Sequence, residues 1–219
     1  MATTIPNEIA LWIFQIIAGI LGAVFLYYGM DVRRKDGARD FVSPTWQTLM
    51  KVCSFALVGG AVWITVSLRQ VNATDWQALV LIAGGTAFVA SAKHTLKKAH
   101  TFTGQYLEKP MLVTRGVYAI TRNPLYFGVL QCELGASLLV IRQAPALWPQ
   151  SYLYWFGIFS TALLYAVSFN WIMAVYESRY LERYFGDEYR RYSAHVSFVF
   201  PLVKPAIGLR KELNDEFHK

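Results

Sequence analysis

The sequence predicts an all-α, polytopic membrane protein with about five transmembrane helices. Hydrophobic residues make up 55% of the 219-residue chain and charged residues only 16%, whereas soluble domains typically hold about 25% charged residues. The apolar residues are concentrated in five long runs, and a helix that crosses a bilayer needs about 20 mainly apolar residues. The solvent of this protein is therefore expected to be lipid.

The expected spans are residues 9–30, 46–68, 76–92, 125–141 and 152–176. The third and fourth runs are short for a bilayer, so we expect these helices to be tilted or only partly embedded. No basic region precedes the first run, which is long enough to span, so no cleavable signal peptide is expected. Because no long linker divides the chain, residues 1–219 are expected to form a single membrane domain.

The basic residues alternate with the spans. Eighteen of the 21 Lys and Arg residues lie in 31–44, in 93–122 or after residue 177. Cytoplasmic segments carry an excess of Lys and Arg, so these three segments are expected to be cytoplasmic and the N-terminus to lie on the far side. The net charge of +7 favours membrane lipids as partners and no nucleic acid, because the cations flank the spans, close to anionic headgroups.

An amphipathic helix is expected after the fifth span, on the cytoplasmic side. Apolar and aromatic residues recur at helical spacing between Leu181 and Tyr192, with charged residues between them. This pattern is typical of a helix in the plane of the membrane interface. Gly186 is expected to interrupt the helix, and residues 196–201 to form a short apolar return.

A first cluster with candidate chemistry spans residues 112–128. Gly116 permits a sharp turn, and Pro124 suits the first turn of the fourth span, where its missing N–H is not needed. The free backbone N–H groups at that helix start can receive a carboxylate. The rings of Tyr118 and Tyr126 can stack on a purine or face a sulfonium cation. Taken alone, the pattern also fits a loop that merely enters a membrane helix.

Carboxylates form the second group of candidates. Glu177, at the end of the fifth span, could bind an ammonium group or ribose hydroxyls, or simply pair with a nearby Arg. Glu133 lies inside the fourth span, and an ionisable residue there is a functional candidate by default. It could face an amine or a proton path, or be paired or protonated within the bundle. Asn170 is expected to bond between helices. We expect no metal site.

Together the clusters resemble the isoprenylcysteine carboxyl methyltransferase family and its relatives among phospholipid and thiol methyltransferases. The signature opens with Leu-Val-Thr-x-Gly-Val-Tyr, matched by residues 112–118, and Arg-His-Pro-x-Tyr-x-Gly, matched by 122–128 except at Asn123. Its later part is Glu-Glu-x-x-Leu, then Phe-Gly-x-x-Tyr-x-x-Tyr and a terminal Pro. Residues 177–201 match that part except at Ser178.

This resemblance implies that residues 100–201 form a cofactor-binding, methyltransferase-like half with a pocket for S-adenosylmethionine. By position, the residues expected to contact the cofactor are His100, Leu112, Val113, Tyr118, Asn123, Pro124, Tyr126 and Glu177. Pro110, Met111, Asn123 and Leu125 differ in type from the family, so only backbone contacts carry over at these positions.

Three departures from the family bear on activity. Asn123 replaces a histidine, although its amide can still donate and accept hydrogen bonds. Ser178 replaces the second glutamate, which lowers the negative charge near the cofactor. In prenylcysteine-processing members an arginine thought to hold the substrate carboxylate precedes the glutamate by four residues. Here that position is Met173, which weakens the case for a carboxylate substrate.

The expected reaction is methyl transfer to a lipid-like acceptor by in-line displacement. Alignment and water exclusion are the main tasks of the protein, because the sulfonium is already a strong leaving group. A prenylcysteine carboxylate is the first candidate acceptor, and phospholipid amines and thiols are alternatives. Arg122 and Glu133 are the candidate catalytic residues, as acceptor contacts. The protein is expected in the endoplasmic reticulum membrane of a eukaryote or the inner membrane of a bacterium, with a cytoplasmic active site.

Two other classes of function remain open from the sequence. Membrane sterol reductases have a similar C-terminal motif and use NADPH, but they are usually longer and have more spans. A non-catalytic membrane interaction protein is the second alternative, if Ser178 and Met173 mark a decayed site. It would bind no cofactor.

Overall fold

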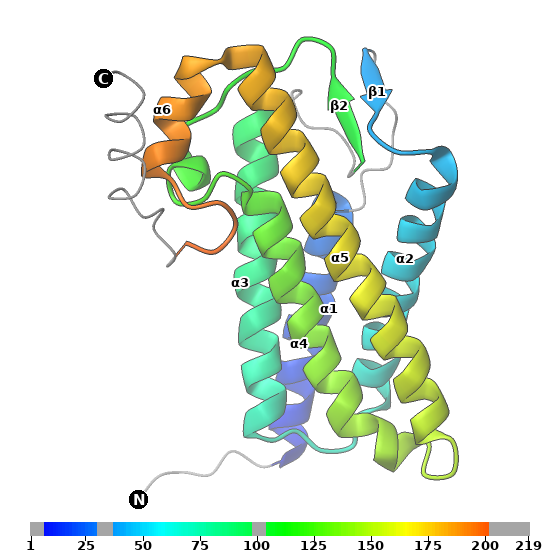
Figure 1. The fold of residues 1–219 in the computed structure, drawn as a ribbon. Helices are drawn as coiled ribbons and strands as arrows, with labels where there is room; N and C mark the ends of the chain where they lie inside the picture. The colour runs from blue at the N-terminus through cyan, green and yellow to red at the C-terminus, as the bar shows by residue number, and fades with distance from the viewer. Residues whose placement is uncertain (1–6, 30–36, 98–103, 202–219) are drawn as a thin grey trace, which may run out of the picture.

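The structure, a computed structural model, describes residues 7–29, 37–97 and 104–201. Within these ranges each long helix runs antiparallel to the long helix before it in the chain (Figure 1). The elements in chain order are α1 (Asn7–Gly29), β1 (Ala38–Asp40), α2 (Pro44–Ser67), α3 (Ala73–Leu96), β2 (Gln105–Leu107), the 3-10 helix η2 (Gly116–Ala119), α4 (Pro124–Leu147), α5 (Tyr152–Phe185) and α6 (Asp187–His195).

Five helices of the described chain, α1 to α5, are long and apolar enough to cross a membrane. This confirms the predicted fold class. The third and fourth spans are longer than predicted, because α3 and α4 have 24 residues each. At about 1.5 Å per residue such a helix measures roughly 36 Å, which exceeds a hydrocarbon core of about 30 Å. Neither helix is therefore too short to cross.

Polar residues and a proline at the helix ends explain why the apolar runs underestimate these two spans. Asn72 and Asp75 form a capping box at the start of α3, in which each side chain accepts a hydrogen bond from the backbone N–H of the other residue. Such a box satisfies N–H groups that a helix start leaves without partners. At its C-terminal end, α4 continues through Pro145 to Leu147.

Glycines bring α3 and α4 into close contact. A Cβ atom on Gly128 would lie 2.6 Å from the carbonyl oxygen of Gly85, and a Cβ atom on Gly85 would clash with the carbonyl oxygen of Gly128. Small residues allow this approach between membrane helices. The contact fixes the first turns of α4 against the later turns of α3.

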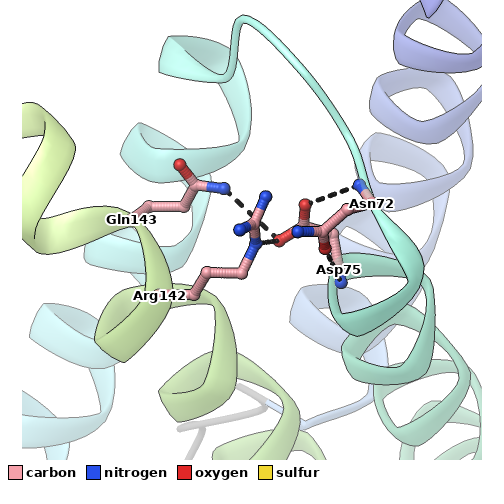
Figure 2. Close-up of polar contacts among 4 residues, drawn as sticks. All are labelled: Asn72, Asp75, Arg142 and Gln143. Atoms are coloured by element: carbon pink, nitrogen blue, oxygen red, sulfur yellow. Dashed lines mark hydrogen bonds and ion pairs between the residues drawn. The ribbon is translucent and has the colours of Figure 1, made fainter.

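A buried polar cluster joins the same two helices near the start of α3 and the end of α4. The Asp75 carboxylate is fully buried and accepts hydrogen bonds from Arg142 Nε at 2.9 Å and Gln143 Nε2 at 3.4 Å. Asn72 completes the cluster through the capping box (Figure 2). Because the carboxylate is paired and hydrogen-bonded, its burial is tolerated.

The opposite end of the bundle, where α1, α3 and α5 end and α2 and α4 begin, is called the basic end below. Here β1 and β2 form a two-stranded antiparallel sheet (Figure 1), which the sequence analysis does not predict. The hydroxyl of Tyr180, in α5, donates to the carbonyl oxygen of Leu107 at 2.7 Å. The sheet is thereby tied to the last turns of α5.

The predicted amphipathic helix is divided between two elements. Its first part continues α5, which runs to Phe185, and its second part is α6. Gly186 separates them with a φ of +54°, a left-handed conformation that favours glycine. This confirms the predicted interruption. Residues 196–201 then return to the start of α4, where Arg122 N–H donates to the Ser197 carbonyl oxygen at 2.8 Å.

Candidate functional site

A cavity, called the first cavity below, lies at the basic end. Its walls come from the end of α3, the segment from β2 to η2, the start of α4, the end of α5, and α6. Segments far apart in the sequence therefore share one space. The residues predicted from the resemblance that line it are Pro110, Met111, Leu112, Val113, Tyr118, Arg122, Leu125, Tyr126 and Glu177.

Local conformation explains how the first cluster reaches the cavity. Gly116 adopts a φ of +63°, in the left-handed region that glycine enters without a steric penalty, and η2 begins there. Pro124 occupies the first turn of α4, where a proline costs no helical hydrogen bond. Between them, the buried Thr121 hydroxyl donates to the carbonyl oxygen of Val199 at 2.9 Å. The C-terminal return thus holds the cluster against α4.

Glu177 and two tyrosines form the centre of the site. The hydroxyl of Tyr126, in α4, donates to the carboxylate of Glu177, in α5. Tyr118, in η2, is buried, and this burial, together with the negative charge of Glu177, raises its pKa well above the ordinary value of 10.0. Tyr118 is therefore neutral at physiological pH. The two clusters meet at one carboxylate flanked by aromatic rings.

Helix α6 closes the cavity with two more tyrosines. The Tyr192 hydroxyl donates to the backbone carbonyl oxygen of Tyr118 at 2.6 Å, which ties α6 to η2. Tyr189 is buried and hydrogen-bonds with Ser178 and Arg122. Burial raises the pKa of both Tyr189 and Tyr192. The site therefore offers neutral aromatic surfaces, which suit a purine or an organic cation.

Two cationic side chains also line the first cavity. Lys93, in the last turn of α3, is only 8% exposed. Arg122 lies over the ring of Phe198, with its guanidinium carbon 5.4 Å from the ring centroid. Its Nε atom is buried and has no hydrogen-bond partner among the described residues. With Glu177, the cavity presents both an anion and cations to a ligand.

Two of the predicted cofactor contacts that the structure describes are not among the residues that line this cavity. Asn123 and Pro124 are buried beside it at the start of α4, so a contact through their side chains is not part of the described cavity. His100 lies outside the described residues. For these three positions the cofactor contact stays a prediction.

Two of the three departures from the family motif, Asn123 and Ser178, are in contact with each other. The Asn123 amide donates to the Ser178 hydroxyl oxygen at 3.5 Å and to the Phe198 carbonyl oxygen at 2.8 Å. A neutral amide and hydroxyl therefore stand where the family has a histidine and a glutamate. Met173, the third departure, is 1% exposed in an apolar cluster that includes Tyr126 and Val199. No cation is held at that position.

The two predicted catalytic residues lie in different cavities. Arg122 lines the first cavity, whereas Glu133 lines a second one, formed mainly by α1, α2 and α4. Glu133 is 8% exposed, and its Oε1 accepts a hydrogen bond from Asn170 Nδ2 at 3.4 Å. This confirms the interhelical role predicted for Asn170. Val129, one turn before Glu133 in α4, lines both cavities.

Lys93 is the charged lining residue that the sequence analysis assigns no role in the site. It counts there only as one of the basic residues that orient the protein. Its position in the last turn of α3 gives no sequence signal for a site, because any cation near a helix C-terminus interacts favourably with the helix dipole. Tyr106 and Tyr180 also line the cavity without having been predicted.

The chain matches a known protein family from α3 into α6. A model of the phospholipid methyltransferase family matches residues 73–188, a range that begins at α3 and ends in α6. An uncharacterized protein from Haemophilus influenzae is 40% identical over 60 residues, which cover 27% of this chain and 89% of that protein. The family match spans more than half of the chain and confirms the predicted kinship with membrane methyltransferases. The chain belongs to the phospholipid methyltransferase family.

Proposed function

We propose that this protein transfers a methyl group from S-adenosylmethionine to a lipid-like acceptor, and that the first cavity holds the cofactor. The observation that carries the proposal is that Tyr118, Tyr126 and Glu177, from three separate elements, line one cavity. Membership of a family of membrane methyltransferases supports it. A carboxylate beside aromatic rings suits a ligand that combines a purine, a ribose and a sulfonium cation.

The charges of the first cavity fit the amino-acid part of the same cofactor. That part carries one carboxylate and one ammonium group, and the cavity presents Lys93 and Glu177. We assign Lys93 to the carboxylate and Glu177 to the ammonium group or the ribose hydroxyls. A zwitterionic ligand carries a charge opposite to that of each of these two side chains. The bound cofactor supplies an activated methyl group on a good leaving group.

The residues of this chain then have positioning tasks rather than a nucleophilic one. The rings of Tyr118 and Tyr126 exclude water and fix the orientation of the cofactor, which is the larger part of catalysis in such a transfer. Arg122 contacts the polar part of the acceptor at the basic end, and Glu133 contacts it deeper in the bundle. The predicted cofactor-binding half comprises residues 100–201. Helix α3, which precedes it in the chain, adds Lys93 to the site.

The distribution of Lys and Arg supports a cytoplasmic location for the first cavity. The cofactor would then enter from the cytoplasm and the acceptor laterally from the bilayer. The membrane is that of the endoplasmic reticulum in a eukaryote or the inner membrane in a bacterium.

Among the acceptors, a prenylcysteine carboxylate loses support from the structure around Met173. This side chain packs in the apolar core, so no cation stands there to hold a carboxylate. A phospholipid amine or a thiol needs no such cation. Both remain candidate acceptors.

A labelled-methyl assay tests the proposed function. The purified full chain is incubated with total membrane lipids and S-adenosylmethionine carrying a labelled methyl group, and label in the lipid extract is measured. We expect label with the unmodified protein and at least about tenfold less with Glu177→Gln, because a hydrogen bond to a charged group contributes about 1.5–3 kcal/mol. Absence of label, together with lipid-dependent oxidation of NADPH, would instead favour the reductase class.

A further inference from the structure

The second cavity lies mainly between α1, α2 and α4. Its volume is about 460 Å³, within the range of about 300–1,000 Å³ typical of small-molecule sites. Most of its lining residues are apolar or glycine and come from α1, α2 and α4. These helices are candidate membrane spans. An occupant of this cavity is therefore largely aliphatic.

One polar atom in the wall of this cavity lacks a partner. Glu133 Oε2 is buried and has no hydrogen-bond partner among the described residues. Two other polar side chains of the wall are engaged: Thr65 Oγ1 donates to the Ala61 carbonyl oxygen at 2.8 Å, and Gln15 Nε2 donates to the Thr65 carbonyl oxygen at 3.0 Å. A buried polar atom without a partner is costly, so a ligand that supplies a hydrogen-bond donor to Glu133 Oε2 gains affinity.

The Glu133 carboxyl group also lies close to the first cavity. Val129, which lines both cavities, precedes Glu133 by four residues, or about 6 Å along the helix. Side chains of an α-helix tilt toward its N-terminus, and the N-terminus of α4 is at the basic end. The carboxyl group is thus directed back toward the border between the cavities.

We propose that the second cavity binds the aliphatic chain of the methyl acceptor and that a neutral hydroxyl group of this acceptor donates a hydrogen bond to Glu133 Oε2. The inference rests on the proposed function for its claim that the occupant is the acceptor. The binding site itself stands on Glu133, Asn170 and the apolar wall.

The depth of Glu133 selects a neutral group. Nine residues separate it from Pro124, so it lies about 13 Å along α4 from the start of that helix. Carrying a charged headgroup to such a depth is costly, and a carboxylate or phosphate would also meet the Glu133 carboxyl group. A hydroxyl carries no charge and both donates and accepts, so it can pair with Glu133 and with the Asn170 amide at once.

Photolabelling of the full chain in detergent tests this assignment. The probes are hexadecanol, hexadecanoic acid and hexadecane, each with a diazirine on the same carbon, and labelled α4 peptides are counted by mass spectrometry. We expect about tenfold more labelling by the alcohol than by the acid or the alkane. This ratio corresponds to about 1.4 kcal/mol, typical of one hydrogen bond.

Matched variants locate the preference. Glu133→Leu should remove it, Glu133→Gln should retain it in part because an acceptor oxygen remains, and Leu134→Gln should leave it unchanged. Leu134 is the neighbouring residue of α4, is 51% exposed and does not line the cavity. Equal labelling by the three probes, or an unchanged preference in Glu133→Leu, would overturn the inference.

Calorimetry with S-adenosylmethionine separates this inference from the proposed function. Glu133→Leu should bind the cofactor as the unmodified protein does, which also shows that the variant is folded. If Glu133→Leu does not bind the cofactor, the inference is decided by comparing the preference for the alcohol probe in Glu133→Gln with that in Leu134→Gln. Alcohol preference without any cofactor binding by the unmodified chain would refute the proposed function while leaving the hydroxyl site in place.

Discussion

The contact between Asn123 and Ser178 predicts that these two departures from the family motif are coupled. The perturbation is a double-mutant cycle in which Asn123→His and Ser178→Glu, which restore the family residues, are made singly and together. Each single change should destabilise the protein. Together they recreate a histidine–glutamate pair at the position where the present chain has an amide–hydroxyl hydrogen bond of 3.5 Å.

The expected magnitude follows from what each residue touches. Asn123 is 5% exposed and donates to the Phe198 carbonyl oxygen at 2.8 Å. Asn123→His therefore loses about 1 kcal/mol of hydrogen bonding and about 1 kcal/mol or more from the larger ring. The charge-assisted pair of the double variant should restore about 1.5–3 kcal/mol.

Thermal unfolding of the four proteins in one detergent measures this coupling. For a chain of about this length, 1 kcal/mol shifts the melting temperature by roughly 2–4 °C, so the double variant should melt about 3–12 °C above the value expected from adding the single effects. Effects that add within about 0.5 kcal/mol would refute the coupling.

Three further predictions concern the helix packing and the buried tyrosine. Asp75→Asn should lower the free energy of unfolding by about 1.5–3 kcal/mol, because the buried side chain loses its charge-assisted hydrogen bond with Arg142. An unchanged melting temperature would contradict the role of the cluster in Figure 2. Gly128→Val should separate α3 from α4 at Gly85. We expect lower stability, measured by unfolding, and weaker cofactor binding, measured by calorimetry. Normal binding by this variant would show that the contact does not position the site. Burial raises the pKa of Tyr118 in the folded state, so above pH ~10 the unfolded chain binds fewer protons than the folded chain. The free energy of unfolding should therefore fall as pH rises past that value. Tyr118→Phe should make this fall less steep.

Composition and charge suffice to predict the number and order of the spans. Their lengths are less predictable, because Asn72 and Asp75 make a polar helix start whose capping role depends on mutual hydrogen bonds. The strands β1 and β2 have three residues each. Such short strands depend on pairing between segments distant in sequence, for which the periodicity of either segment gives no signal.

The candidate site is likewise only partly predictable from the sequence. Motif spacing predicts that Tyr118, Tyr126 and Glu177 converge, because each belongs to a recognisable pattern at a helix end. It does not predict Lys93, whose charge is indistinguishable in the sequence from the cations that orient the chain. Motif spacing also does not predict that Arg122 and Glu133 lie in different cavities, because the division into two cavities depends on how α1 and α2 pack against α4.

Binding of S-adenosylmethionine to the purified chain, measured by calorimetry for the unmodified protein, Glu177→Gln and Glu182→Gln, tests the central claim most directly. Glu182 is the matched control, because it lies on the same helix but pairs with Arg190 outside the first cavity. We predict saturable binding to the unmodified protein and to Glu182→Gln, and an affinity at least about tenfold lower for Glu177→Gln. Equal affinities for all three proteins, or no binding by the unmodified protein, would contradict the convergence of the two clusters on a cofactor site.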